Sequence, residues 1–250
     1  MNKINFFLIF WIGIACQAQN LDSLFTSANK LYQQESYVKA LEVYQQIESK
    51  QHESSALYFN IANIYYKTNQ VAPSIYYYEK ALKLAPNDKD ILFNLGFAQR
   101  MTLDTIEALP KSLGQKFRDT VILKFTYNTW AIIAVIFAFL FALLFLLYHF
   151  SYSTVKKRIY FISSILVVVF TLLSIFFSYK NYQYIQNTVS AIIYVQQAAV
   201  KNAPTQTSNV NFELHEGTKV LILETLDTWR KIKIADGKTG WIEEKKLKEI

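Results

Sequence analysis

The chain has 250 residues, of which 52% are hydrophobic and 16% aromatic, with one cysteine and a formal net charge of +7. The basic excess lies beside two long apolar stretches and not on one soluble region, which fits membrane boundaries and argues against a nucleic-acid-binding domain. One cysteine excludes intrachain disulfides and thiolate metal clusters.

Residues 1–18 have the pattern of a secretory signal peptide. Lys3 supplies a short positive region, Ile4–Ala15 an apolar core, and small residues flank a cleavage site after Ala18. Two alternatives stay open: Cys16 would be the acylated residue of a lipoprotein, or the segment would be retained as an anchor.

Residues 21–103 repeat with a period of 34 residues. Small residues recur where two helices would approach closely, and aromatic residues recur where they would interlock. The pattern resembles the tetratricopeptide repeat, and it predicts two full repeats followed by one capping helix. The recurring positions include the small residues Ala28, Ala62 and Gly96 and the pair Tyr44 and Tyr78.

In the tetratricopeptide family, the concave face formed by the first helices binds peptides or partner segments. The resemblance implies a partner-binding groove that is aromatic with two amides, so we expect an apolar or aromatic partner segment. The alternative for about half of these rings is packing between helices. The implied groove residues are Phe25, Asn29, Tyr32, Phe59, Asn63, Tyr66, Phe93 and Phe97.

Residues 111–128 are predicted to form an amphipathic juxtamembrane segment. Apolar residues recur at every fourth position, and basic residues between them would reach lipid headgroups, so the lipid bilayer is an expected partner. The apolar positions are Leu113, Phe117, Val121 and Phe125, and the basic ones are Lys116, Arg118 and Lys124.

Residues 130–150 and 159–179 carry no formal charge. Each reaches the roughly 20 residues that a helix needs to cross a bilayer, so both are predicted to be transmembrane helices. A soluble core helix is the alternative, but such a helix usually shows a polar stripe and neither stretch has one.

Residues 151–158 connect the two spans and carry Lys156, Lys157 and Arg158 with no acid. Short basic loops stay on the cytoplasmic side. This places the flanking domains in the periplasm and predicts a multi-pass protein of a bacterial inner (plasma) membrane.

Residues 198–250 show short strands joined by tight turns, while residues 181–197 are interpreted as a continuation of the second span or a tether. The C-terminal region resembles the bacterial SH3-like domain, whose members often bind cell-wall peptides or partner proteins. In that family a Gly-Trp pair closes the barrel, so the tryptophans are expected to be mainly structural. The signature residues are Gly217, Trp229, Gly240 and Trp241.

The predicted fold class is a multidomain membrane protein: an all-α tetratricopeptide repeat domain, two transmembrane helices and a small all-β SH3-like barrel. This order, together with the segments Ala81–Asp88 and Leu214–Val220, resembles the BatE-type aerotolerance proteins. The resemblance implies von Willebrand A-type membrane partners and a role in stress tolerance.

The sequence does not indicate an enzyme. His52, His149 and His215 are far apart, and the chain lacks HExxH and GxSxG motifs. No cofactor, metal site or catalytic residue is therefore expected. Three functions remain: a protein-interaction scaffold, a peptidoglycan-binding anchor led by the SH3-like domain, and a sensor, which is disfavoured because the connector is short.

Overall fold

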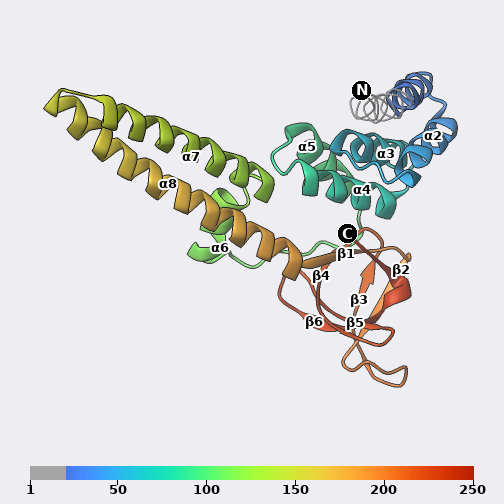
Figure 1. Cartoon of the computed structure of the whole chain (residues 1–250). Helices are drawn as coiled ribbons and strands as arrows, with labels where there is room; N and C mark the ends of the chain where they lie inside the picture. The colour runs from blue at the N-terminus through green and yellow to red at the C-terminus, as the bar shows by residue number, and fades with distance from the viewer. Residues whose placement is uncertain (1–20) are drawn as a thin grey trace, which may run out of the picture.

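The computed structural model describes residues 21–250, so the predicted signal segment at 1–18 lies outside the described residues. It consists of a helical array, a long helical hairpin and a C-terminal β domain (Figure 1). The predicted fold class is confirmed at this level: a helical repeat region, two long apolar helices and an antiparallel sheet domain, in that order.

The helical array follows the 34-residue period. Residues 21–33 are helical and are followed by α2 (Tyr37–Ser49), α3 (Ser55–Lys67), α4 (Val71–Leu84) and α5 (Lys89–Gln99). Side chains that cap helix N-termini set two of the starts, because Ser54 accepts from Leu57 N and Asp88 from Ile91 N. The fully buried residues of the period are Ala28, Ala40, Tyr44, Ala62, Ser74 and Tyr78.

Gly96 departs from the predicted pattern of small residues at close helix contacts. An added Cβ at Gly96 would meet no heavy atom within 4 Å, whereas Ala28 and Ala62 are fully buried. The reason is that α5 is not followed by a second helix of its own, because the chain leaves it as an irregular segment over residues 101–112.

Helix α4 is buried on every side. Successive residues of a helix point about 100° apart, so its three consecutive tyrosines face three neighbours. The Tyr78 hydroxyl donates to Asn63 on α3 (2.5 Å), and the Tyr77 hydroxyl donates to Glu48 on α2 (2.9 Å). Tyr76 faces the β domain. Helix α4 therefore joins the repeats to the rest of the molecule.

The hairpin consists of α7 (Tyr127–Phe150) and α8 (Thr154–Asn187), which pack against each other along their length. Both are long and apolar enough to cross a membrane. Only 6% and 17% of their most apolar 18-residue windows are buried, whereas a soluble core helix would be mostly buried. The outward surface is apolar, as a lipid-facing hairpin requires.

Both helices extend beyond the predicted spans. Helix α7 begins at Tyr127 rather than 130 because Thr126 caps it, and α8 covers 154–187 rather than 159–179. The connector between the two helices covers only residues 151–153, whereas 151–158 was predicted. Its basic residues instead occupy the start of α8, since Lys and Arg are good helix formers.

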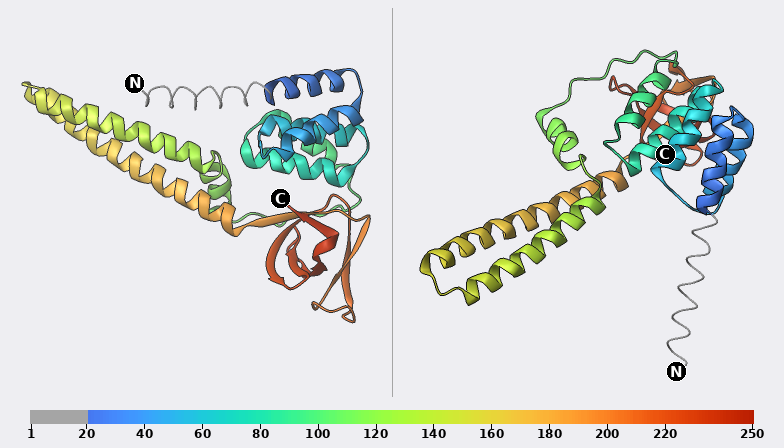
Figure 2. Two further views of the ribbon diagram at one scale, coloured as in Figure 1. Left: turned by 45° about the vertical axis from the view of Figure 1, so that its right-hand side comes forward. Right: turned by 90° about the horizontal axis from the view of Figure 1, so that it is seen from above.

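Two short helical elements precede the hairpin. Helix α6 (Leu113–Phe117) begins with a capping box between Ser112 and Gln115, and a π-helical turn, η1 (Arg118–Ile122), follows it. The predicted amphipathic segment at 111–128 is therefore only partly helical. Figure 2 shows it folded back beside the base of the hairpin.

The β domain, residues 189–250, is one antiparallel sheet in the order β3-β2-β6-β5-β4-β1-β7, curled around an apolar core (Figure 2). Turns at Gly217 and Gly237 use positive φ angles of 84° and 93°. The strands are β1 (Val189–Ile193), β2 (Gln197–Lys201), β3 (Val210–His215), β4 (Lys219–Leu226), β5 (Trp229–Lys233), β6 (Thr239–Glu243) and β7 (Leu247–Glu249), with a 3₁₀ turn at Glu244–Lys246.

The sheet begins before the predicted domain start at 198. Residues 181–187 continue α8, as one of the two interpretations of 181–197 expected, but the tether interpretation does not fit the remainder, which contains β1. Strand β1 pairs with both β4 and β7, so it is integral to the sheet. Four of its five residues are buried, and this gives an apolar run without the polar alternation that marks a half-buried strand.

Candidate functional site

A hollow on the concave side of the repeats gathers side chains from three helices. Tyr32 comes from helix 21–33, Asn63 and Tyr66 from α3, and Phe97 from α5. The hollow has a volume of about 330 Å³. Its open aromatic and amide lining suits an extended peptide segment with a ring or an aliphatic side chain.

The other four predicted groove residues do not line this hollow. Phe25 and Phe59 are half-buried against tyrosines of the second helices, with ring centroids 5.7 Å from Tyr44 and 5.9 Å from Tyr78. They are packing residues, because the rings fill the space between the helices of each repeat.

Asn29 and Phe93 are the other two predicted groove residues that do not line the hollow, and neither fills the space between helices as Phe25 and Phe59 do. Asn29 Oδ1 accepts hydrogen bonds from the Tyr44 hydroxyl (2.5 Å) on α2 and from Asn60 Nδ2 (3.0 Å) on α3, so this amide is held between the first two repeats. Phe93 is 67% exposed, with its ring edge-on to Phe97 at 4.8 Å. It adds an open apolar surface beside the hollow.

Two lining residues were absent from the predicted set: Lys67 and Asn94. Asn94 lies 34 residues after Asn60, so the repeat period could have placed it on the same face. Lys67 ends α3, one residue after Tyr66, and it gives the hollow a positive charge that the aromatic pattern did not suggest.

The four SH3-like signature residues are structural in the described fold. Trp229 and Trp241 are each 9% exposed. A Cβ on Gly240 would lie 2.5 Å from Val200 Cγ1, so glycine permits the close approach of β2 and β6. A Cβ on Gly217 would lie 2.8 Å from Thr102 Cγ2 on the segment after α5, and 3.0 Å from Ile75 Cδ1 on α4.

The segment between the repeats and the hairpin lies across the β domain. Asp104 binds three groups there: its carboxylate accepts from His215 N (2.7 Å) and Thr218 Oγ1 (2.5 Å), and it contacts His215 Nδ1 at 2.7 Å. Ile106 packs on the core of the β domain, and Leu109 N donates to Ala235 O (3.0 Å). This face of the β domain is therefore covered by its own chain.

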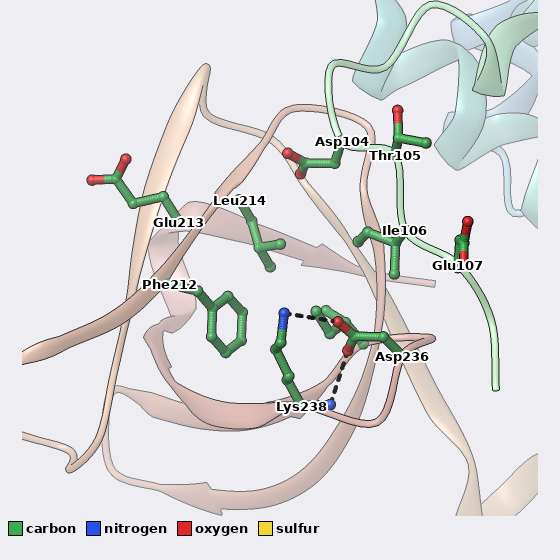
Figure 3. Close-up of a pocket in the computed structure, with 10 residues that line it drawn as sticks. Asp104, Thr105, Ile106, Glu107, Phe212, Glu213, Leu214, Asp236 and Lys238 are labelled. Atoms are coloured by element: carbon green, nitrogen blue, oxygen red, sulfur yellow. Dashed lines mark hydrogen bonds and ion pairs between the residues drawn. The ribbon is translucent and has the colours of Figure 1, made fainter.

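A second hollow, of about 340 Å³, lies at this seam (Figure 3). Figure 3 shows Asp104, Ile106 and Glu107 on one side and Phe212 and Leu214 on the other. Its acids are largely satisfied within the protein, because Asp104 binds the β domain and Asp236 pairs with Lys238 (3.1 Å). The hollow is thus part of the contact between this segment and the β domain.

The β domain also packs on the outer face of α4, and we call this contact the joint. The Tyr76 ring lies edge-on to Tyr194 (5.8 Å), with Lys248 Nζ 4.3 Å from the Tyr76 centroid. Glu79, only 8% exposed, binds Lys219 Nζ at 2.6 Å. The joint makes the repeats and the β domain one soluble body.

The described residues were compared with the requirements of a metal centre and of a nucleophile with its base. Within 21–250, no three His, Cys, Asp or Glu side chains lie close enough to hold a metal ion. His215 is engaged by Asp104, and neither hollow places a nucleophile beside a base. Whether the chain has an enzymatic activity stays a prediction from sequence.

Comparison with known proteins identifies both soluble domains. Residues 55–88 match a tetratricopeptide repeat model, residues 77–110 match a second one, and residues 195–249 match the bacterial SH3 domain. No curated protein matches the chain. Together with the two apolar helices, these matches indicate a membrane-associated protein that binds other proteins or the cell wall, with the SH3 domain pointing to an extracytoplasmic location.

Proposed function

We propose that the chain is a membrane-anchored scaffold that binds an apolar segment of a partner protein in the repeat groove, outside the cytoplasm. The main support is the hollow lined by Tyr32, Tyr66 and Phe97, with Phe93 exposed beside it. An open cluster of aromatic rings is typical of binding surfaces. The covered face of the β domain leaves the groove as the main free aromatic surface of the soluble body.

Partner capture in intact cells tests the groove. A photoreactive amino acid at Tyr66 should cross-link a discrete membrane protein, and Phe97→Ser should weaken that cross-link at least several-fold because a hot-spot ring is lost. Leu103→Ser, which removes a side chain that is 75% exposed outside the groove, should leave it unchanged. Equal cross-linking in all three proteins would show that the Phe97 ring does not contribute to binding, and the absence of a discrete cross-link at Tyr66 would exclude the groove.

The resemblance to BatE-type proteins supplies a specific proposal for the partner: a von Willebrand A-type membrane protein in an aerotolerance complex. It stays a prediction from sequence. Identification of the protein cross-linked at Tyr66 by mass spectrometry tests it directly, because another class of protein in the cross-linked band would reject the assignment.

The extracytoplasmic side of the soluble body is part of the proposal. Both ends of the hairpin are basic: Lys156, Lys157 and Arg158 lie at the tip, and a second group of bases lies at the base. The distribution of charge alone therefore does not determine which end of the hairpin faces the cytoplasm. The bacterial SH3 domain at 195–249 is the stronger support for an extracytoplasmic soluble body.

Cysteine labelling tests this orientation. In a background with Cys16→Ala, a membrane-impermeant maleimide added to intact spheroplasts should label Lys39→Cys and Lys238→Cys. It should not label Tyr152→Cys until the membrane is broken, since this position lies at the tip of the hairpin. The reverse labelling pattern would place the soluble body in the cytoplasm.

The bacterial SH3 match also favours a second candidate function, binding of peptidoglycan. Co-sedimentation of the detergent-solubilised full chain with purified peptidoglycan tests it. The full chain is required because a fragment starting at residue 198 would lack β1, which pairs with two other strands. Co-sedimentation that survives Phe97→Ser would assign this binding to the β domain.

A further inference from the structure

We infer that the base of the hairpin holds a binding site for the phosphate of an anionic phospholipid headgroup. The site is a hollow of about 350 Å³ between η1 and the last turns of α8. Two cationic side chains line it, together with four polar ones and one aliphatic. The lining residues are Arg118, Ile122, Lys180, Gln183, Tyr184, Asn187 and Thr188.

The segment that carries Arg118 is fixed to the hairpin. Asn181, 2% exposed, donates from Nδ2 to the carbonyls of Ile122 (3.0 Å) and Phe125 (2.6 Å). Trp130 Nε1 donates to the same Ile122 carbonyl (2.9 Å). The hollow is therefore a formed feature and does not depend on a free loop.

The hollow lies at the depth of the headgroup layer. The Phe177 ring packs edge-on to the rings of Phe117 and Trp130, with centroid distances of 6.4 Å and 5.1 Å. Phe117 is itself 51% exposed, so these rings mark the edge of the apolar layer. Tyr184 lies seven residues further along α8, which is about 10 Å at 1.5 Å per residue. Headgroups occupy a layer about 5–8 Å deep on each side of the hydrocarbon, so the stretch from Lys180, about 5 Å beyond Phe177, to Tyr184 covers this layer and its outer edge.

Arg118 is held in an orientation that suits a phosphate. Its guanidinium carbon lies 4.5 Å from the centroid of the Tyr184 ring, and Nε donates to Asp119 Oδ1 (3.1 Å). A guanidinium fixed at Nε can present its terminal nitrogens as a fork, the geometry that binds phosphate through two hydrogen bonds. The Lys180 ammonium supplies a second charge.

The charge at this level is not neutralised by the protein. None of the described residues that line the hollow is acidic, and the neighbouring Asp119 pairs with Arg118 and with Lys111 Nζ (2.7 Å). Within the described chain, no carboxylate pairs with Lys116, Lys124 or Lys180. This excess attracts an anionic surface and explains why the base of the hairpin is basic even though the tip is too.

Native mass spectrometry of the full chain tests the site, with phosphatidylglycerol and phosphatidylcholine as the two probes. The wild type should retain phosphatidylglycerol on the order of tenfold better, and Arg118→Gln with Lys180→Gln should abolish that preference. Lys39→Gln with Lys89→Gln makes the same change of charge on the repeats and should have no effect. Arg118→Lys keeps the charge without the fork and should retain an intermediate amount, which provides a second reading should the double variant unfold.

Two results would overturn the inference: equal retention of the two lipids by the wild type, or equal retention of phosphatidylglycerol by the two double variants. A third arm adds inorganic phosphate. Displacement of the lipid by phosphate as effectively as by added phosphatidylglycerol would identify a site for soluble anions and would also reject a lipid site. None of these outcomes bears on the groove.

Discussion

At the scale of single residues, Asp104 ties the segment after the repeats to the β domain. Its side chain is 13% exposed and binds the His215 backbone, the His215 ring and the Thr218 hydroxyl. Burial raises the pKa of Asp104, but the hydrogen bonds from Thr218 and His215 lower it by more, and the net pKa lies below the ordinary value.

We expect Asp104→Asn to lower the free energy of unfolding by about 1–3 kcal/mol at neutral pH, because the network loses its charged acceptor. Since the folded pKa lies below the unfolded one, the carboxylate contributes fully above about pH 4, and the contribution is lost as the pH falls through the folded value. The difference between wild type and variant should therefore shrink below about pH 4. Urea unfolding in detergent, followed by tryptophan fluorescence, measures both effects.

Glu107→Gln is the matched control, because this acid is exposed on the same segment. It should change the free energy of unfolding by less than about 0.5 kcal/mol at either pH. A loss equal to that of Asp104→Asn, or a difference that grows on acidification, would contradict the role of the Asp104 network.

At the scale of elements, Asn181 is the buried polar group of the juxtamembrane region. Asn181→Ala removes two hydrogen bonds and should cost roughly 1–3 kcal/mol of local stability, because the Phe125 carbonyl loses this donor while the Ile122 carbonyl keeps only Trp130 Nε1. Amide exchange over 113–126 should become faster in lipid nanodiscs, whereas Gln186→Ala, an exposed neighbour on the same helix, should not change it. Unchanged exchange in both variants would show that Trp130 alone holds the segment.

Tyr76 tests the joint in the same way. Tyr76→Ala removes a ring that is 7% exposed. Substituting a buried aromatic costs about 3–5 kcal/mol, and here the loss should fall mainly on the contact between α4 and the β domain. Trypsin should then cut near Lys111 several-fold faster, while Val38→Ala, at a side chain that is 71% exposed on α2, should leave the rate unchanged. Equal cleavage rates would show that the joint does not protect this segment.

Periodicity explains which elements could be predicted from the sequence. The 34-residue repeat predicted the helices because each unit carries its own spacing of small and aromatic residues. The two long apolar helices were predicted from their uncharged, apolar composition. Strand β1 could not be recognised, since Ala191–Ile193 is continuously apolar and directly follows a helix. No local sequence pattern could predict the joint, because Glu79 and Lys219, which pair in it, are 140 residues apart in the chain.

The candidate groove was predicted in part for a related reason. Of the residues implied by the tetratricopeptide resemblance, Tyr32, Asn63, Tyr66 and Phe97 lie around one hollow, because equivalent residues of stacked repeats share a face. The resemblance could not separate groove residues from packing residues: Phe25 and Phe59 occupy equivalent positions, and both rings turn toward the tyrosines inside their repeats.

At the scale of the whole molecule, two halves of the chain build one soluble body at the same end of the hairpin (Figure 1). A chain split within residues 151–153 should therefore reassemble. The co-expressed fragments should co-purify in detergent, held by the packing of α7 on α8 and by the joint. Tyr76→Ala should reduce the yield of the pair several-fold, and fragments that elute separately would show that neither contact is sufficient.

The joint has a consequence for biogenesis. Its two faces lie some 140 residues apart in the chain and are separated by both long apolar helices. On the proposed topology, a nascent polypeptide whose first apolar helix alone has crossed the bilayer holds the two faces in opposite compartments, with the apolar side of α4 exposed. On that topology the joint closes only after both helices are inserted, and an incompletely inserted molecule exposes an apolar surface to proteases and chaperones.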